Sequence, residues 1–587
     1  MMNFPKNWKC NESKEIKKEL FSKFSYSPIL IKILASRNIK TEEEISSFLN
    51  PTLKNLHNPE LLPAVEKGII RVKKAISNRE NILIFGDYDT DGIVSSVLVY
   101  NFLKKLGLKA DIYIPSRFKE GYDINIDFIK RVSKKGYYNL IICVDCGTNS
   151  REVRKYICSS RTNIDVIVCD HHQPLNINDV SKEDYNKEKE NYIIINPKLD
   201  SSRYPFKHLS GAGVTFKFIT AVLRNLDERY KKKFKKDYLT KLLDMVAIST
   251  IADIMPLIDE NRIIVKKGLK MLKNTTNRGL KKMMEVVLKD KQEINTYDIG
   301  FIIAPRLNAA GRIKTAEYSV NLLKGDTESA EKLGEMVNGL NSLNEKRQNL
   351  QKKMLDEVVR KNDFSIIVSK QKIFIDKSKE WSEGVLGIVA SGLVKKFNIP
   401  VILFKEKEGK LKGSGRSIEK FDLHKNLSSL RNFFEKFGGH EQACGITMDK
   451  SKFSCFKERM IKIACDKLDK DDTTKSFYYD LEVTFKNINS RLVSEIRLLQ
   501  PFGVGNPKPI FVTRNCDVTS ISYLKDEKHV RLKLKNNGVV FSTVMFNIDD
   551  DVKKKLHTQK DISVLYNIEE NLWNGQKTTR LLILDIF

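Results

Sequence analysis

Three aspartates at alternate positions in a turn bounded by glycines are the residues best suited to chemistry. Asp87, Asp89 and Asp91 stand at every second position between Gly86 and Gly92. Carboxylates this close raise one another's pKa unless a cation lies among them, so the spacing favours a bound metal ion. Taken alone, the pattern is equally compatible with a solvated acidic turn, and it also resembles a calcium loop.

Acidic or histidine residues follow three further apolar runs downstream. Residues 140–144 are followed by Asp145, residues 165–169 by Asp170-His171-His172, and residues 245–252 by Asp253. Chance does not readily place such side chains after four separate apolar segments. The recurrence therefore favours a metal site over four unrelated surface turns.

The apolar runs are the elements that must position these side chains. Residues 82–85, 140–144 and 165–169 lack helical spacing and are typical of strands buried on both faces. In a parallel sheet the loops at the carboxyl ends of the strands converge on one crevice, so we expect the acidic loops to meet there. Strands and helices alternate in this region, as right-handed crossovers require: we expect helices at 93–106 and 124–134, further strands at 110–114 and 192–195, and a charged surface loop at 178–191.

These motifs resemble a known family. Asp-Tyr-Asp-x-Asp-Gly at 87–92, Val-Asp-Cys-Gly at 144–147 and Asp-His-His at 170–172, in this order, are similar to the DHH phosphoesterase superfamily. Within it, the chain resembles the RecJ family of bacterial single-strand-specific exonucleases over nearly its whole length. The resemblance implies phosphodiester hydrolysis with two metal ions, digestion of single-stranded DNA from 5′ to 3′, release of 5′ mononucleotides, and a role in DNA repair and recombination.

The ligand set follows from the residue types and from this resemblance. Carboxylates with a histidine and no thiolate select hard divalent ions, so Mn²⁺ or Mg²⁺ is expected rather than zinc. By carry-over from the family motifs, two ions would be held with Asp145 bridging, by Asp89, Asp91, Asp145, His171 and Asp253.

Three neighbouring residues are expected to assist these ligands. Asp87 stands near the place where other DHH enzymes have a histidine, so it is predicted to be a ligand or an orienting group. Asp170 is expected to orient His171, and His172 to orient the substrate or a bridging water. The predicted catalytic residues are Asp145, His171 and His172.

Further motifs suggest contacts to phosphate. Residues 304–312 contain two arginines and an asparagine around a glycine; alone they are typical of a surface loop at a helix start, but the family resemblance favours substrate contact. Glycine turns at 413–417 and 437–440 would form a phosphate pocket, although a lone histidine is more often a buried structural residue. The predicted substrate-binding residues are Arg306, Asn308, Arg312, Ser414, Arg416, Ser417 and His440.

Two other features bear on the site. Ser210-Gly-Ala-Gly213 could be taken for a phosphate-binding loop, but close packing of a helix start is the preferred interpretation. The family usually has a histidine after the tryptophan that corresponds to Trp381, and this chain has Ser382. The contribution of that imidazole is therefore in doubt here.

Composition sets broader limits. Lys and Arg outnumber Asp and Glu by 103 to 74, a net charge of +29, which suggests a polyanionic partner, although an AT-rich genome also enriches Lys. Nine scattered cysteines fit a reducing cytoplasm, and Cys143, Cys146 and Cys169 are interpreted as strand and site-edge residues. The chain has no apolar run long enough for a bilayer, so we expect a cytoplasmic protein without membrane contact.

At 587 residues the chain requires several units. We expect an α/β protein in which a DHH-type parallel-sheet domain is joined by a long helix to a second, DHH-associated α/β domain, followed by an OB-like β-barrel. Basic residues alternate along one predicted barrel strand, at Arg531, Lys533 and Lys535; they would bind single strands or form a solvated face. The predicted parts are a helical segment packed on the main domain at 1–75, the DHH domain at 76–325, the connecting helix at 326–362, the DHH-associated domain at 363–470 and the barrel at 471–587.

Two other functions stay open at this point. The chain could be a DHH hydrolase of small phosphates such as oligoribonucleotides, cyclic dinucleotides or pyrophosphate, or a non-catalytic replication scaffold. Asp87 and the C-terminal barrel disfavour the first, and the intact acidic loops disfavour the second. The sequence leaves a helicase and a single-strand-binding protein open as partners of a single-stranded-DNA exonuclease.

Overall fold

The computed structural model describes residues 6–11, 25–116, 120, 123–159, 162–175, 191–289, 291–325, 329–525, 527–573 and 576–587. The chain divides into two compact units. We call the unit formed by Ser46–Glu345 and Leu499–Pro507 the catalytic unit because it contains the predicted catalytic residues, and the unit formed by Met1–Ile45, Lys346–Leu498 and Lys508–Phe587 the C-terminal unit. The predicted charged loop at 178–191 falls almost entirely outside the described residues.

A five-stranded, wholly parallel sheet is the centre of the catalytic unit. The strand order is β3-β2-β4-β5-β6, which confirms the predicted parallel sheet. Because both faces are covered, β2, β4, β5 and β6 are almost continuously apolar and buried, whereas the edge strand β3 is partly exposed. Their bounds are β2 (Ile82–Gly86), β3 (Ala110–Tyr113), β4 (Leu140–Val144), β5 (Asp165–Cys169) and β6 (Tyr192–Ile195).

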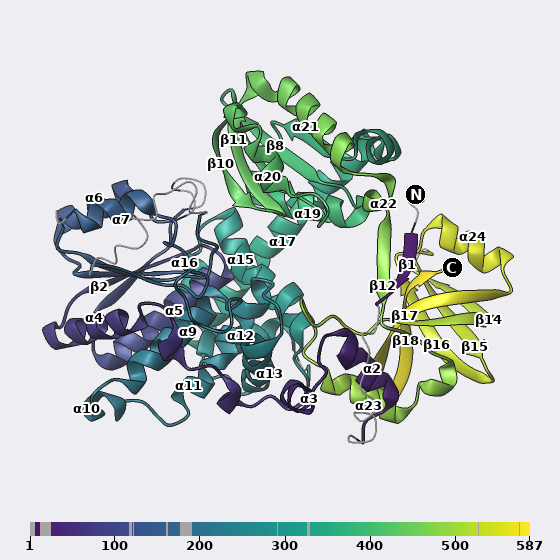
Figure 1. Cartoon of the computed structure of the whole chain (residues 1–587), viewed down its shortest axis with the longest axis horizontal. Coiled ribbons are helices and arrows are strands. Elements are labelled where there is room, and N and C mark those ends of the chain that lie inside the picture. The colour runs from purple at the N-terminus through teal and green to yellow at the C-terminus, as the bar shows by residue number, and fades with distance from the viewer. Residues whose placement is uncertain are drawn as a thin grey trace. The chain divides into compact units, whose positions relative to one another are not determined.

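Helices cover the two faces of this sheet (Figure 1). Alternate strand residues point to opposite faces, so Ile84 and Ile142 belong to one core and Phe85 and Cys143 to the other. The first face packs against α4 (Val65–Asn78), α5 (Thr90–Leu106) and α9 (Gly211–Arg224), and the second against α6 (Ile126–Lys135) and α7 (Arg151–Cys158).

The rest of the catalytic unit is helical. A π-helical segment, η4 (Asp298–Ile303), leads directly into α15 (Ala304–Ile313). The long helix α17 (Ala330–Lys361) carries the chain from one unit into the other, as expected of a connector. Further α-helices among the described residues are α10 (Glu228–Lys231), α11 (Tyr238–Lys241), α12 (Leu243–Ala252), α13 (Asp259–Leu272), α14 (Arg278–Val287) and α16 (Glu317–Lys324).

In the C-terminal unit, the segment that follows α17 forms a mixed five-stranded sheet. The order is β10-β11-β9-β8-β7, and only the β7–β8 pair is parallel. The strands are β7 (Phe374–Ser378), β8 (Val401–Lys407), β9 (Lys410–Arg416), β10 (Phe434–His440) and β11 (Ala443–Asp449); the helices are α18 (Phe364–Ile366), α19 (Leu386–Phe397), α20 (Leu423–Ser428), α21 (Phe453–Lys467) and α22 (Lys470–Thr473).

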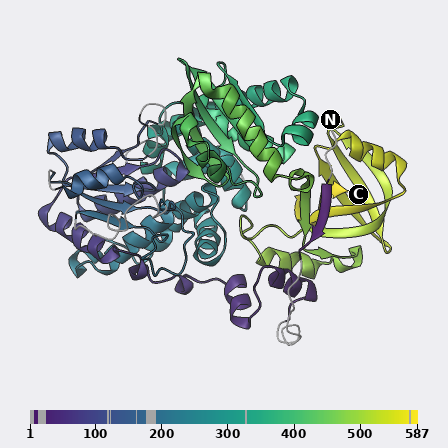
Figure 2. The same cartoon turned by 45° about the horizontal axis from the view of Figure 1, so that its top comes forward.

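The last strands form a closed barrel, in agreement with the predicted OB-like domain. The order β14-β15-β16-β18-β17 is closed by pairing of β17 with β14, and the yellow strands in Figure 2 curve around a common interior. The strands of this sheet are β13 (Leu481–Glu482), β14 (Phe511–Leu524), β15 (His529–Asn536), β16 (Val539–Phe546), β17 (Asp561–Trp573) and β18 (Gln576–Ile586); the same part of the chain contains α23 (Ser490–Leu498), α24 (Asp550–Thr558) and β12 (Lys475–Tyr479), which pairs with β1 in a separate sheet.

Local structure differs from the sequence-based expectation in three places. Near the N-terminus, β1 (Lys6–Cys10) is a strand that pairs in parallel with β12, and α2 (Pro28–Ser36) and α3 (Glu42–Leu49) are the first helices among the described residues. Residues 304–312 are helical rather than a loop. The glycines at 413–415 and 438–439 lie within strands β9 and β10 rather than in turns, because strand pairing satisfies their backbone groups.

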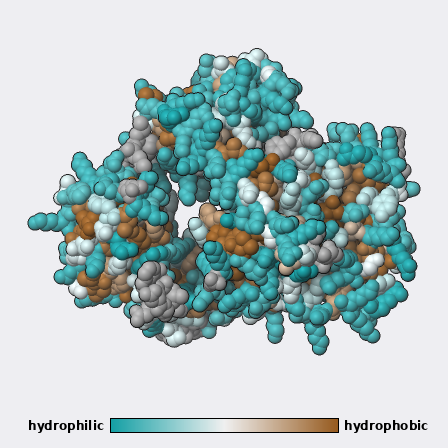
Figure 3. All heavy atoms as spheres, turned by 180° about the vertical axis from the view of Figure 1, so that it is seen from behind, coloured by the Kyte–Doolittle hydropathy of each residue, from teal (hydrophilic) through white to brown (hydrophobic). Residues whose placement is uncertain are grey.

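The molecular surface is consistent with the composition. Seen from behind, it is mainly hydrophilic, and the apolar patches are separated by hydrophilic residues (Figure 3). Among the described residues, none of the helices combines the length and the apolar character that crossing a membrane would require.

Candidate metal centre

The first acidic turn is the N-terminus of a helix. Asp89 is the N-cap residue of α5, and its carboxylate accepts hydrogen bonds from the backbone N–H groups of Asp91 (2.9 Å) and Gly92 (3.1 Å). Residue 92 must be glycine, because a Cβ there would lie 2.4 to 2.6 Å from backbone atoms of Asp87. The tight turn brings ligand oxygens of Asp87 and Asp89 within 4.8 Å of each other.

Asp91 is buried and is held by the start of another helix. Its two oxygens accept hydrogen bonds from the backbone N–H groups of Gly211 (2.7 Å) and Ala212 (2.8 Å) at the N-terminus of α9, and from the Ser249 hydroxyl. Burial and the charge of Asp89 raise the pKa of Asp91 to about 6. The glycine-rich start of α9, which could be taken for a phosphate-binding loop, therefore binds the carboxylate of Asp91.

Asp145 follows β4 in a backbone conformation that side chains rarely adopt. Its φ is +61°, in the left-handed region, and its N–H donates to the Cys169 carbonyl at 2.9 Å. Such conformations persist where surrounding structure fixes them, and they are frequent at functional sites. Gly211 packs directly against this residue, because a Cβ at 211 would lie 2.7 Å from the Asp145 Cβ.

Asp170 organises the loop after β5. One of its oxygens accepts from the backbone N–H groups of His171 (2.7 Å) and His172 (3.1 Å) and lies 2.8 Å from His172 Nδ1, while the other accepts from the Thr148 N–H at 3.0 Å. Although burial opposes both shifts, the pairing of these two side chains lowers the pKa of Asp170 and raises the pKa of His172 to about 9. Asp170 is thus charged and fixes both histidines.

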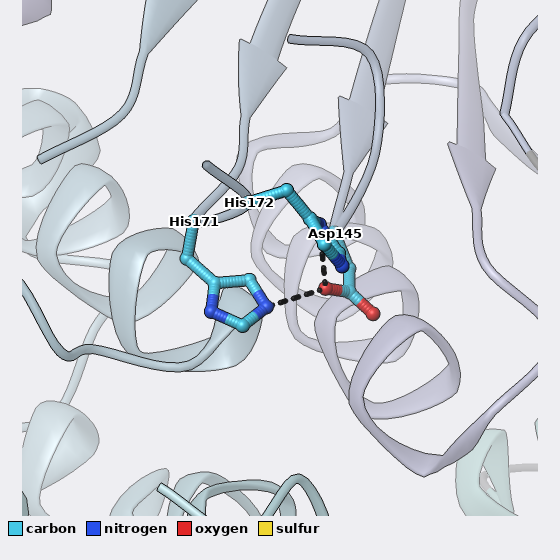
Figure 4. Close-up of side chains that lie close together, drawn as sticks. All are labelled: Asp145, His171 and His172. Atoms are coloured by element: carbon cyan, nitrogen blue, oxygen red, sulfur yellow. Dashed lines mark ion pairs between the residues drawn. The ribbon is translucent and has the colours of Figure 1, made fainter. Parts of the chain in front are cut away.

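The His171 imidazole lies among three carboxylates. Its Nε2 atom is 3.1 Å from Asp145 Oδ1, 3.5 Å from Asp253 Oδ2 and 3.7 Å from Asp91 Oδ2. Figure 4 shows that His171 and His172 both face the same Asp145 oxygen, with His172 Nδ1 at 3.9 Å. Burial and the positive charge of His172 lower the pKa of His171 to about 3, so its imidazole is neutral, the form that binds metals.

Asp253 enters the cluster from the end of helix α12. Its backbone N–H donates to the Ser249 carbonyl at 2.9 Å, and the next residue, Ile254, has a φ of +58° that turns the chain away from the helix. Burial, followed by the charges of Asp91 and Asp89, raises the pKa of Asp253. The fourth predicted loop therefore reaches the same place as the other three.

All six predicted ligands fall into three overlapping groups. In each group, candidate ligand atoms lie within 4.8 Å of one another, and Asp145 and His171 each belong to two groups. Within the described part of the chain, neither His171 Nε2 nor Asp253 Oδ2 makes a hydrogen bond, although both are buried. Carboxylates that repel one another, together with an imidazole, fit hard divalent cations. The groups are Asp145/His171/His172, Asp91/His171/Asp253 and Asp87/Asp89/Asp145.

Nearby thiols do not join this donor set. Cys143, Cys146 and Cys169 are buried, and burial raises the pKa of each thiol, so each stays protonated. A thiolate ligand requires the opposite shift. Their surroundings agree with the interpretation of these cysteines as packing residues.

The predicted substrate residues of the catalytic unit lie on α15. The Asn308 amide oxygen accepts from the backbone N–H (2.7 Å) and the hydroxyl (2.9 Å) of Thr90, the first residue of α5. The Arg306 guanidinium is held by the Asn341 side chain (2.7 Å) and by the Ile302 carbonyl (2.7 Å). Asn308 thus fixes the helix that carries Asp89 and Asp91.

The other predicted substrate residues lie in the C-terminal unit. Arg416 Nη1 donates to Ser414 Oγ (3.0 Å) and to the Gly415 carbonyl (2.7 Å), so arginine and serine form one polar group on β9. Ser417 donates to the Phe421 carbonyl and is buried, whereas His440 is exposed at the end of β10. Contact of these residues with substrate stays a prediction.

Sequence reasoning missed the residues that hold the predicted ligands in place. Ser249 and the N–H groups of Gly211 and Ala212 all support Asp91. The glycine-rich start of α9 is recognisable in the sequence as a candidate anion-binding helix start. Its partner, Asp91, lies 120 residues away and could not be identified from the sequence. Nothing about Ser249 distinguishes it within an apolar helical run.

Family comparisons agree with this architecture. Residues 81–250 match the model of the DHH family N-terminal domain, residues 366–466 match the DHHA1 domain, and residues 479–585 match the RecJ OB domain. The three matches follow the order of the parallel sheet, the mixed sheet and the barrel.

Named relatives extend over nearly the whole chain. The single-stranded-DNA-specific exonuclease RecJ of Bacillus subtilis is 33% identical over 97% of this chain and 69% of its own length. The protein of the same name from Haemophilus influenzae is 30% identical over 95% of this chain and 96% of its own length. The crystal structure of RecJ in complex with Mn²⁺ from Thermus thermophilus covers 99% of this chain and 80% of its own, with a TM-score of 0.81 and 25% identity.

We predict that Gly211→Ala weakens cation binding. The new methyl group would displace Asp145 and disturb the N–H groups that hold Asp91, so the affinity for Mn²⁺ should fall by at least about tenfold, as for other groups that support ligands. Because an ion bound only by the folded protein stabilises it, the measurement is the rise in melting temperature with Mn²⁺ concentration.

Gly213→Ala is the matched control for this change. It lies in the same helix turn, but the atoms nearest to its Cβ position belong to the Leu209 and Ser210 side chains, at 3.2 to 3.5 Å, and not to Asp145. Equal Mn²⁺-dependent stabilisation of wild type and Gly211→Ala would contradict the assignment.

Proposed function

The chain belongs to the RecJ family of single-stranded-DNA-specific exonucleases, and on that premise we propose that it cuts single-stranded DNA at the 5′ end with two divalent cations, Mn²⁺ or Mg²⁺. The observation that carries the proposal is the sharing of Asp145 and His171 between overlapping ligand groups. Solved RecJ structures contain Mn²⁺ or Mg²⁺. Release of 5′ mononucleotides and a role in DNA repair and recombination belong to the same proposal.

We assign the ligand roles as follows. Asp145 is central because its carboxylate belongs to the group of Asp87 and Asp89 and also lies beside His171. A carboxylate shared in this way suits a bridge between two cations. The six proposed ligands are Asp87, Asp89, Asp91, Asp145, His171 and Asp253.

Two cations at this site would supply an activated water and would stabilise the charge on the attacking and leaving oxygens of an in-line displacement at phosphorus. The protein residues around them have distinct tasks. Asp170 is a positioning residue that holds both histidines through hydrogen bonds. His172, whose pKa is raised, places a positive charge 3.9 Å from Asp145 and suits contact with a substrate phosphate.

The polarity of digestion would come from recognition of a terminal phosphate. The Ser414–Arg416 group on β9 and the exposed His440 offer charged and polar donors of the kind that bind phosphate. Arg306 and Arg312 on α15 are further cationic candidates in the catalytic unit. These residues are therefore proposed to bind the substrate backbone.

The barrel offers a surface for the rest of the strand. Along β15, Val530, Leu532 and Leu534 are buried and Arg531, Lys533 and Lys535 are exposed, so three cations lie in a row on one face. Single-stranded DNA binds such faces through backbone charge together with base stacking. We propose that this row contacts phosphates downstream of the cut.

The proposed substrate implies partners of two classes. Duplex DNA must be opened before an exonuclease for single strands can act, which a helicase would do. A single-strand-binding protein would cover the strand that is exposed. Both are proposed on the chemistry of the substrate alone.

We predict that Asp145→Ala and Asp253→Ala each abolish hydrolysis. Removal of a group that orients a metal ligand lowers activity by up to about 100-fold, so loss of a ligand itself should lower activity by more. Binding of a labelled single strand in Ca²⁺ should persist in both variants, because the barrel and the arginines are unchanged. A wild-type rate in either variant would overturn the ligand assignment.

The chemistry can be separated from that of other DHH enzymes with labelled substrates. We expect a 20-mer labelled at its 5′ end to release the label as a mononucleotide at the earliest times, and a 3′-labelled strand to retain it until the end. EDTA should stop both reactions. Faster cleavage of a dinucleotide than of the 20-mer would favour a small-phosphate hydrolase instead, and no cleavage of either would favour a scaffold.

We predict that replacing Arg531, Lys533 and Lys535 together by alanine lowers the salt dependence of binding. At roughly 0.7 per phosphate contact on single strands, the slope of log affinity against log salt should fall by about 2. Replacement of the exposed Lys232, Lys235 and Lys236 between α10 and α11 is a charge-matched control. An unchanged slope in the barrel variant would exclude this face from the DNA path.

A further inference from the structure

A short segment of the C-terminal chain belongs to the catalytic unit. Residues 499–507 lie between α23 and β14, two elements of the C-terminal unit, but they group with the unit that contains the metal ligands. The Thr296 hydroxyl donates to the Phe502 carbonyl at 2.8 Å, and the Arg262 guanidinium to the Leu499 carbonyl at 2.9 Å. We call residues 502–506 of this segment the strap.

The strap is a tight turn with a fixed shape. Gly503 and Asn506 exchange backbone hydrogen bonds of 2.9 and 3.1 Å around Val504 and Gly505, and Gly505 has a φ of +72°. The Asn506 side chain is fully buried and donates to the Leu499 (2.8 Å) and Pro501 (2.7 Å) carbonyls. These hydrogen bonds within the segment fix the conformation of the turn.

The strap lies directly on the loop that follows Asp253. The buried Leu257 donates its backbone N–H to the Val504 carbonyl at 2.7 Å. Strap and loop pack tightly: a Cβ at Gly503 would lie 2.7 Å from Leu257 Cδ1, and a Cβ at Gly505 would lie 3.2 Å from Pro256 Cβ, which is closer than most Cβ contacts. The absence of a side chain at both glycines thus lets Leu257 and Pro256 pack closely against the strap.

The strap is one of several contacts that hold this loop, because Leu257 also packs against Ala247 and Val265 in the interior of the catalytic unit. Between the end of α12 and the start of α13, residues 253–258 have no regular secondary structure. Two hydrogen bonds connect the loop to the neighbouring helices: the Asn261 amide of α13 donates to the Pro256 carbonyl at 3.0 Å, and the Met255 N–H donates to the Thr250 carbonyl of α12 at 3.1 Å. The strap supplies the contact on the other side, three to five residues after Asp253.

We propose that the strap positions Asp253 for cation binding, so that the C-terminal chain completes the frame of the metal centre. The strap holds Leu257 and Pro256, the loop holds Asp253, and Asp253 lies 3.5 Å from His171. This inference rests on the proposed role of Asp253 as a ligand. It goes beyond that role because it gives the strap, more than 240 residues further along the chain, a part in metal affinity.

The test is Mn²⁺ binding to the full-length protein without DNA, measured from the electron paramagnetic resonance signal of free Mn²⁺. Gly505→Ala adds a methyl group against Pro256 and strains a left-handed backbone. We expect Mn²⁺ affinity at the weaker site to fall by about 10- to 100-fold, the range for groups that orient ligands. Excess Mn²⁺ should restore the nuclease rate of Gly505→Ala but not of Asp253→Ala.

Gly409→Ala is the matched control. Gly409 has nearly the same φ, +75°, in the turn between β8 and β9, and no atom lies within 4 Å of the position of its Cβ. Gly409→Ala strains the backbone as Gly505→Ala does, but Gly409 does not contact the Asp253 loop. We therefore expect Gly409→Ala to bind Mn²⁺ with wild-type affinity. Thr296→Val, which removes the hydrogen bond to Phe502 with little change of volume, provides a milder variant if Gly505→Ala does not fold, with an expected loss of about threefold to tenfold.

The outcomes distinguish the two levels of the proposal. If Asp253→Ala loses Mn²⁺ affinity while Gly505→Ala and Thr296→Val match wild type, the strap has no positioning role and the ligand assignment stands. If Asp253→Ala itself binds Mn²⁺ like wild type, the ligand assignment fails. Equal loss in Gly505→Ala and Gly409→Ala would show a general effect of strain and would also overturn the inference.

Discussion

Mutual repulsion of buried carboxylates is the constraint on which the site depends. Asp87, Asp89, Asp91, Asp145 and Asp253 converge with one neutral imidazole, and burial together with neighbouring charge raises the pKa of Asp91, Asp145 and Asp253. Such a cluster is stable only if protons or cations neutralise it. Divalent cations neutralise the carboxylates without protonating them, so the oxygens remain ligands. A nuclease can therefore retain an arrangement that would otherwise oppose folding.

The fold counters this repulsion with rigid supports. The carboxyl ends of β2, β4 and β5 supply three of the loops, and the start of α9 supplies N–H groups to Asp91. Helix α9 is in turn tied to α13 by a buried ion pair between Lys217 and Glu260. A parallel sheet suits this task because its strand ends already meet at one edge.

The sequence predicted those parts that local patterns encode. Apolar runs followed by Asp or His predicted the strands and the clustering of the acidic and histidine side chains, because a buried parallel strand is apolar along its whole length. Contacts between distant backbones left little trace: Gly211 against Asp145, and the strap against Leu257, depend on pairings that only the folded chain reveals. Glycine spacing alone also misplaced residues 413–415 and 438–439 in turns, since glycine is equally at home in strands that approach other groups closely.

The central claim is that two divalent cations occupy one cluster and share Asp145. The most direct measurement is anomalous diffraction at the manganese edge from a crystal of the full-length protein soaked in Mn²⁺. Two peaks within coordinating distance of Asp145, one beside Asp87 and Asp89 and the other beside His171 and Asp253, are the expected result. Absence of anomalous density among these side chains at a Mn²⁺ concentration that supports cleavage would contradict the account.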